Sequence, residues 1–289
     1  MLSSIAVRDD GEQEYALGAQ HRAAEDGATT VPPGAAWRAA EMSVAGITVV
    51  SVVRSAVITR ASSGYPDVPR ARQEPAGPGA AGPGLAGLGL AERGLAELGL
   101  AELEFAVIDL ETTGWSPEAA AITEIAAVRV RGGVRRGEFA SLVNPGVPVP
   151  PGIEDLTGIS DWMLAAAPGV AAVLPGLLRF AEGCVLVAHN APFDVGFLLA
   201  ACTACGLAWP GFTVLDTVML ARHVMDPDEV PDCKLGTLAG FFRAGTSPCH
   251  RALADARATA DVLGWLIRRL NHRGVRTLGQ LADWPDVVA

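Results

Sequence analysis

Two carboxylates separated by one residue form the strongest local pattern in this sequence that could do chemistry. Asp109 and Glu111 follow the apolar run of residues 105–108 and precede a Thr-Thr-Gly turn signal. Because side chains alternate along a β-strand, residues i and i+2 lie on one face, so both carboxylates are expected to point the same way. Like charges in apolar surroundings repel and lose hydration, and the pair therefore predicts a bound cation.

Two further segments place acidic residues and an imidazole where helices are expected to begin. In AHNAPFD, residues 188–194, the proline suits a first helical turn and puts Asp194 early in a helix. In CHRALAD, residues 249–255, His250 precedes a long helix and Asp255 falls in its first turns. Taken alone, Asp194 is most simply explained as a first-turn carboxylate favoured by the helix dipole, and a lone histidine at position 250 would usually be a loop residue.

Together these segments supply four carboxylates and one imidazole, namely Asp109, Glu111, Asp194, Asp255 and His250. Oxygen ligands suit hard divalent ions such as Mg²⁺ or Mn²⁺. Two such ions about 3.5 to 4 Å apart can stabilise the attacking and departing oxygens of a phosphoryl displacement. A neutral histidine can accept the proton of an attacking water. The constellation predicts phosphodiester hydrolysis with two divalent cations, Mg²⁺ or Mn²⁺.

The elements that must position these residues follow a regular order from Glu104 onward. Apolar runs with Gly132 and Gly133 between them predict three antiparallel strands, at 104–110, 122–134 and 138–145. Further strands are expected at 184–190 and 212–217, and helices at 170–181, 192–204, 217–224, 234–242 and 251–270. A strand meander followed by alternating helix and strand is typical of an α/β sandwich with a mixed sheet.

The composition changes near residue 104 and predicts three parts: a low-complexity, disordered leader and linker at 1–103, a folded domain at 104–270, and a tail at 271–289. Five prolines in residues 60–83 indicate a linker, and residues 43–53 could form one isolated strand. Four five-residue units such as GLAEL fill residues 84–103, and their period matches neither helix nor strand. We interpret them as a connector. The alternative is a stripe of leucines that binds a partner. Part of the leader is expected to be an overlong translation start.

Charge and cysteine content narrow the class of protein. The net charge of −10 argues against nonspecific coating of nucleic acid, which depends on Lys and Arg. Five cysteines in a chain of 289 residues fit a reducing cytoplasm, and the acidic start does not fit a signal peptide. No apolar run is long enough to cross a membrane. Cys202 and Cys205 have metal-like spacing, but buried thiols in a helix are the preferred explanation over zinc.

The motifs DLETTG, HNAPFD and HRALAD, in this order, resemble those of the DEDDh (DnaQ-like) 3′-to-5′ exonucleases, the family of the proofreading ε subunit of bacterial DNA polymerase III. The resemblance implies a ribonuclease H-like fold with a five-stranded mixed sheet. It also implies that Asp109, Glu111 and Asp255 are metal ligands, that Asp194 serves the second ion directly or through water, and that His250 is the general base. The implied substrate contacts are Thr112, Thr113, Gly114, Ile159, His189, Asn190 and Phe193.

This resemblance predicts an enzyme that shortens single-stranded or frayed DNA 3′ ends in proofreading or repair and releases nucleoside monophosphates. RNA 3′ ends remain an alternative substrate, because discrimination depends on contacts to the 2′-hydroxyl that the sequence does not locate. A catalytically silent module that binds a polymerase or nucleic acid is the alternative of another class. A DNA polymerase catalytic subunit is kept open as a partner, no membrane partner is expected, and the expected location is cytoplasmic.

Overall fold

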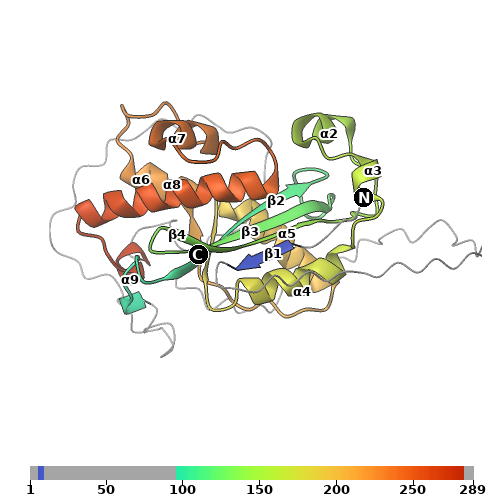
Figure 1. Cartoon of the computed structure of the whole chain (residues 1–289), viewed down its shortest axis with the longest axis horizontal. Coiled ribbons are helices and arrows are strands. Elements are labelled where there is room, and N and C mark those ends of the chain that lie inside the picture. Colours follow the sequence, from blue (N-terminus) through green and yellow to red (C-terminus); the bar gives the residue numbers. More distant parts are fainter. Residues whose placement is uncertain (1–5, 10–95, 283–289) are drawn as a thin grey trace, which may run out of the picture.

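The computed structural model describes residues 6–9 and 96–282, so the possible strand at 43–53, the proline-rich linker and most of the repeat units lie outside the described residues. Its centre is a sheet of order β1-β4-β3-β2-β5-β6 (Figure 1). The strands are β1 (Ala6–Asp9), β2 (Glu104–Thr112), β3 (Ile122–Arg131), β4 (Val134–Leu142), β5 (Val185–Ala188) and β6 (Val214–Asp216).

Strands β2 to β6 confirm the predicted five-stranded mixed sheet. The neighbours β2, β3 and β4 pair antiparallel, whereas β5 is parallel to β2 and β6 is parallel to β5. The predicted hairpin turns at Gly132 and Gly133, whose φ angles of 59° and 78° require the left-handed backbone that glycine adopts readily. A sixth strand was not expected: β1 pairs antiparallel with β4, in register Ala6↔Ala140. Without β1, β4 would be an edge strand with unpaired backbone N–H and C=O groups, and residues 6–9 of the leader pair with these groups.

Helices follow the sheet in the order expected. The predicted ones are α4 (Val170–Phe180), α5 (Ala191–Ala204), α6 (Thr217–Val224), α7 (Leu235–Phe242) and α8 (Ala252–His272). Three short helices were not predicted: α2 (Pro151–Thr157), α3 (Asp161–Leu164) and α9 (Leu278–Ala282). The helix α2 begins at a proline and ends at Gly158, which has φ 67°. Proline suits a first helical position as well as a loop, so the Pro/Gly content of this stretch concealed the helix.

Two apolar clusters occupy the two faces of the sheet, and β2 contributes alternate residues to each. Phe105 and Val107 belong to the cluster that includes α8, whereas Ala106 and Ile108 belong to the cluster that includes α4 and α5. In Figure 1, α8 crosses one side of the sheet and α4 lies on the other. By this alternation the next odd-numbered residues of β2 face the side of α8. The fold thereby brings the D-x-E pair under the helix that carries the third motif.

The folded core extends beyond residues 104–270 at both ends. Leu100 and Leu103, from the last repeat unit, are buried in the cluster that includes α8, as are Leu278 and Leu281 of α9. The backbone amide of Leu100 also donates to the carbonyl of Arg276 at 2.7 Å. Among the described residues, no helix is both long and apolar enough to span a bilayer.

Candidate active site

Three carboxylates from two elements meet at one edge of the sheet. Asp109 and Glu111 lie at the end of β2, and Asp255 lies in the first turn of α8. One oxygen from each of these side chains lies within 4.8 Å of the others. The pairing of β2 with β3 is irregular between Glu111 and Thr112. Such irregularities redirect side chains at the ends of strands.

The carboxylate of Asp255 is oriented by the loop before α8. Its Oδ1 accepts a hydrogen bond from the amide of Cys249 at 2.8 Å, and the backbone of His250 and Arg251 adds further hydrogen bonds. Asp255 is only 8% exposed. The three amides hold a buried carboxylate in one orientation, with its negative charge toward the partners on β2.

Asp194 lies beside the three-carboxylate group without being part of it. It occupies the first turn of α5, is 4% exposed, and is hydrogen-bonded to the backbone of Leu110. After burial, the charge of Asp194 has the largest effect in raising the pKa of Asp109. The structure therefore brings all four predicted carboxylates into electrostatic contact, with three of them close enough to share one ion.

The electrostatics of this group favour a bound cation. Burial, followed by repulsion from Asp194, Asp255 and Glu111, raises the pKa of Asp109 well above its usual value. Burial and the charge of Asp255 raise the pKa of Glu111 to about 8, although Arg251 opposes this rise. Carboxylates held together against desolvation and repulsion form the donor set that hard divalent ions prefer, so these residues fit Mg²⁺ or Mn²⁺.

His250 lies at the exposed rim of the group, one residue before Arg251. Its backbone has φ 55°, a left-handed conformation that is uncommon for residues other than glycine. The His250 charge is among the influences that lower the pKa of Asp255 against the effect of burial. The imidazole is thus both accessible to solvent and close to a predicted ligand, as a general base requires.

The residues that follow the D-x-E pair shape the backbone. Thr112 Oγ1 donates to the carbonyl of Gly114 at 2.5 Å, and Thr113 Oγ1 accepts from the amide of Ala121 at 2.9 Å. Both threonines are buried, and a Cβ added at Gly114 would lie 3.2 Å from the Cβ of Ala120. These contacts of the three predicted substrate-binding residues all lie within the turn after β2.

His189 and Asn190 are likewise held by the interior. The Nδ1 of His189 lies 2.9 Å from Thr217 Oγ1. Burial lowers the pKa of His189 to about 4, although a hydrogen bond with the backbone of Cys233 opposes this. Asn190 has φ 75°, and its backbone N–H donates to Asp216 Oδ1 at 3.1 Å. The same oxygen accepts from the backbone amide of Val218 at 2.8 Å, so Asp216 caps the start of α6. These contacts join the start of α5, which carries Asp194, to the start of α6.

Phe193 lies in an aromatic row that sequence reasoning only partly found. Its ring centroid is 5.0 Å from that of Phe197 and 6.4 Å from that of Trp115. Phe197 is buried, whereas Trp115 is 76% exposed. The signal that could have identified Trp115 is its position directly after Gly114, where a turn carries an aromatic ring away from the core.

Ile159, a predicted substrate contact, has its side chain inside the fold. It is fully buried in a small cluster with Val149 and Leu164. The neighbouring apolar side chains cover Ile159, so a direct contact with a terminal nucleotide would require its side chain to become exposed. The exposed apolar side chain of this segment is Leu156, which is 40% exposed.

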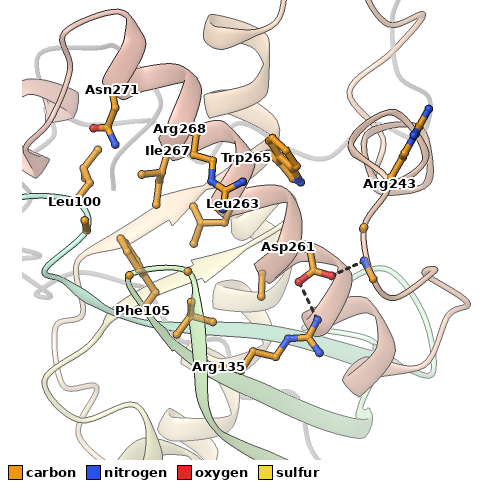
Figure 2. Close-up of a pocket in the computed structure, with 18 residues that line it drawn as sticks. Leu100, Phe105, Arg135, Arg243, Asp261, Leu263, Trp265, Ile267, Arg268 and Asn271 are labelled. Carbon is orange, nitrogen blue, oxygen red and sulfur yellow. Dashed lines mark hydrogen bonds and ion pairs between the residues drawn. The ribbon is translucent and has the colours of Figure 1, made fainter.

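A cavity of about 390 Å³ lies away from the carboxylates, between α8 and the turn that joins β3 to β4 (Figure 2). Leu100, Phe105 and Leu263 line it, and Asp261 is paired with Arg135 there at 2.8 Å. None of the residues of the three motifs lines this cavity. It lies near the start of β2, whereas the candidate site lies at the end of that strand.

Comparison with known proteins identifies the family. Residues 106–263 match the sequence profile of the RNase_T exonucleases. The chain belongs to the RNase_T exonuclease family. This confirms the family resemblance that the three motifs carry, and it places the residues of all three motifs inside the matched region.

Proteins of similar sequence carry the names of nucleases or DNA polymerases. The chain is 50% identical over 188 residues to a Mycobacterium tuberculosis protein whose name describes a bifunctional exonuclease/endonuclease, covering 63% of this chain and 29% of that protein. It is 41% identical over 176 residues to a DNA polymerase III subunit epsilon-like protein of Rhodobacter capsulatus, covering 60% and 25%. A PolC-type DNA polymerase III of Caldanaerobacter subterraneus is 41% identical over 175 residues, covering 61% and 12%. The chain thus spans less than a third of the length of these relatives.

Solved structures share the fold. Exonuclease I of E. coli in complex with a dA16 oligonucleotide aligns with a TM-score of 0.53 at 20% identity, covering 59% of this chain and 42% of that chain. Exonuclease I of Methylocaldum szegediense aligns with a TM-score of 0.50 at 20% identity, covering 59% and 41%. At these identities the similarity concerns the architecture, and it confirms the expected ribonuclease H-like fold.

Proposed function

We propose that this chain is a 3′-to-5′ exonuclease that hydrolyses phosphodiester bonds at single-stranded or frayed DNA ends and releases nucleoside monophosphates. The observation that carries the proposal is the meeting of Asp109, Glu111 and Asp255, with oxygens within 4.8 Å of one another, beside the buried Asp194. Family membership supports the same reaction class.

The three carboxylates would hold one divalent cation, and Asp194 would serve the second directly or through water. When bound, Mg²⁺ or Mn²⁺ would polarise the scissile phosphate and stabilise charge on the attacking and leaving oxygens. His250, exposed beside Asp255, would accept the proton of the attacking water. The buried amide contacts of Asp255 keep its carboxylate oriented while the histidine changes its charge.

The exposed ring of Trp115 and the adjacent Phe193 would stack on bases near the strand end. Base–aromatic stacking tolerates any base and supplies about 1 to 3 kcal/mol for each base. This fits an enzyme that removes nucleotides in succession. The polymerase names of the relatives support a DNA polymerase catalytic subunit as a further proposed partner.

The proposal is tested with oligonucleotides labelled at the 5′ or the 3′ end, offered as DNA or as RNA of matched sequence with Mn²⁺. We expect a ladder of shortened 5′-labelled DNA, and a decrease of roughly 100- to 10,000-fold in rate for His250→Ala. Asp109→Ala is expected to abolish the reaction. His272→Ala, at the exposed far end of α8, is the matched control and should retain the rate.

Full activity in His250→Ala would refute its role as general base. Shortening that starts from the 5′ end would refute the direction, and faster degradation of RNA than DNA would refute the substrate. Asp109→Ala must keep the thermal unfolding cooperativity of the wild type, which separates a catalytic effect from unfolding.

A further inference from the structure

The negative charge of Glu124 on β3 is unfavourable at its position unless a positively charged group pairs with it. It is directly opposite Glu111 across the β2–β3 pair, and like charges in that arrangement repel. Its carboxylate is nearly buried, with 8% of the side chain exposed. Yet Glu124 does not belong to the three-carboxylate group whose oxygens lie within 4.8 Å of one another. Some task other than holding the same ion must account for an acid at this position.

The hydrogen bonds of Glu124 show what it holds. Arg251 donates to it twice, from Nε at 3.1 Å and from Nη2 at 2.8 Å, in the forked geometry of a strong charge-assisted pair. The amide of Ala252, the first residue of α8, donates to the same carboxylate at 2.9 Å. One buried side chain of the sheet is thus bonded to two consecutive residues at the start of α8.

These two residues directly follow His250, which needs external support. Its left-handed φ of 55° is unfavourable for a residue with a side chain, and such a backbone persists where neighbours hold it. The residue before His250, Cys249, is held by Asp255 at 2.8 Å. The residue after it is held by Glu124. The strained histidine therefore lies between two carboxylate anchors, one from α8 and one from β3.

We propose that Glu124 and Arg251 form a clamp that positions His250 for proton transfer, and that both are positioning residues of the hydrolytic reaction. This inference rests on the proposed function. In the clamp, the sheet fixes the loop from one side, so that the imidazole meets the water beside the carboxylates that β2 carries. The guanidinium also stays close enough to Glu111 to oppose the repulsion there.

A second ion pair of the same kind provides a matched control. Arg257, further along α8, donates to Glu138 of β4 from Nε at 2.7 Å and again from Nη2. The Glu138 side chain is 19% exposed. This pair also joins α8 to the sheet, but its helix residue lies six positions after Arg251. Substitution of Glu138 therefore reproduces the loss of a helix-to-sheet ion pair without loss of the clamp.

The experiment compares Glu124→Gln, Arg251→Lys and Glu138→Gln in the full chain, with Mn²⁺ and a 5′-labelled DNA oligonucleotide. Removal of groups that orient a catalytic residue typically lowers activity by roughly 10- to 100-fold. We expect such a decrease in kcat for both clamp variants, with KM within about twofold because substrate is not contacted. Glu138→Gln is expected to keep kcat within about twofold.

Two further measurements separate positioning from general stability. If Glu124 acts through His250, Glu124→Gln has little additional effect in a His250→Ala background, since the two changes remove one function. In the metal-free protein, hydrogen exchange should become faster at the amides of Cys249 and Ala252 in Glu124→Gln and remain unchanged in Glu138→Gln. This exchange readout needs no activity.

An active wild type with equal kcat in Glu124→Gln and Glu138→Gln would overturn the clamp, as would unchanged exchange at Ala252. Fully additive effects with His250→Ala would overturn action through the histidine. An inactive wild type would instead refute the proposed function. The clamp as a loop anchor would then stand or fall on the exchange result alone. Arg251→Lys keeps the conclusion testable if Glu124→Gln does not fold.

Discussion

Glu111→Gln is expected to stabilise the metal-free protein while it removes nuclease activity. The substitution keeps the shape of the side chain and deletes the charge that repels Asp255. In the native state the pKa of Glu111 rises from 4.5 to about 8 because of burial and neighbouring carboxylates. The carboxylate group thus lowers the free energy of unfolding of the metal-free protein, and in return it provides ligands for an ion.

The pKa gives the size of the effect. A tenfold change in a proton equilibrium corresponds to about 1.4 kcal/mol, so the ionised carboxylate is disfavoured by roughly 4 to 5 kcal/mol in the folded state. Glu111 is partly exposed, and solvent screens such interactions, so we expect Glu111→Gln to recover about 1 to 2 kcal/mol at pH 8. For a domain of this size that is a rise in melting temperature of roughly 2 to 8 °C.

The sign with pH follows from proton binding. The native state holds the Glu111 proton more tightly than the unfolded chain does, so the wild type loses stability as pH rises from about 4.5 to about 8. Glu111→Gln lacks this contribution and should show a smaller decrease. At pH 5 the carboxyl is protonated in the folded wild type, and the two proteins should differ little.

The assay is urea or thermal unfolding in EDTA at several pH values between 5 and 8, repeated with excess Mn²⁺. Mn²⁺ should stabilise the wild type, because it binds the folded state, and should stabilise Glu111→Gln much less. Glu182→Gln, a change at an exposed glutamate, is the control. Equal stability of wild type and Glu111→Gln at pH 8 without metal would refute the account of repulsion in the carboxylate group.

Two other substitutions test the boundaries of the fold and the proposed strand contact. Leu100→Ala should lower the free energy of unfolding by about 2 to 5 kcal/mol because Leu100 is 1% exposed. The control is Leu98→Ala, in the adjacent repeat unit, which should have little effect because Leu98 is 42% exposed. Equal effects of the two substitutions in urea unfolding would show that the last repeat unit is not part of the core. Trp115→Ala should raise KM for single-stranded DNA by roughly tenfold through loss of stacking, with little change in the free energy of unfolding. The control Trp265→Ala, on α8 beside the remote cavity, should leave KM unchanged. Steady-state kinetics that show the same KM for the two variants would exclude Trp115 from the path of the DNA strand.

Local chemistry allowed much of the architecture to be predicted. The alternation of β2 places Asp109 and Glu111 on one face through backbone geometry alone. The two glycines at 132 and 133 require a turn, and Asp216 suits a helix cap. The order of strands and helices after Glu104 follows from such nearest-neighbour preferences, and it was sufficient to predict the mixed sheet.

The short or isolated features escaped prediction for the same reason. The four residues of β1 carry no pattern that distinguishes a strand, and their pairing depends on an available edge of β4. Leu100 and Leu103 belong to a repeat whose period fits no regular element, yet the core accepts them. Ile159 and Leu156 lie in one segment, and only the packing around Val149 determines which of the two is buried.

The sequence by itself determined which chemical groups are available and on which local face each lies: carboxylates two residues apart on a strand, and a histidine ahead of a helix. The motifs predicted that Asp255 acts with Asp109 and Glu111, but only the tertiary structure decided that their oxygens lie within 4.8 Å of one another and that Glu124 holds the loop of His250. The physical reason is the range of the forces involved. Backbone geometry acts between neighbours in the chain, whereas the distance between carboxylates on β2 and α8 is set by how a helix packs on a sheet face.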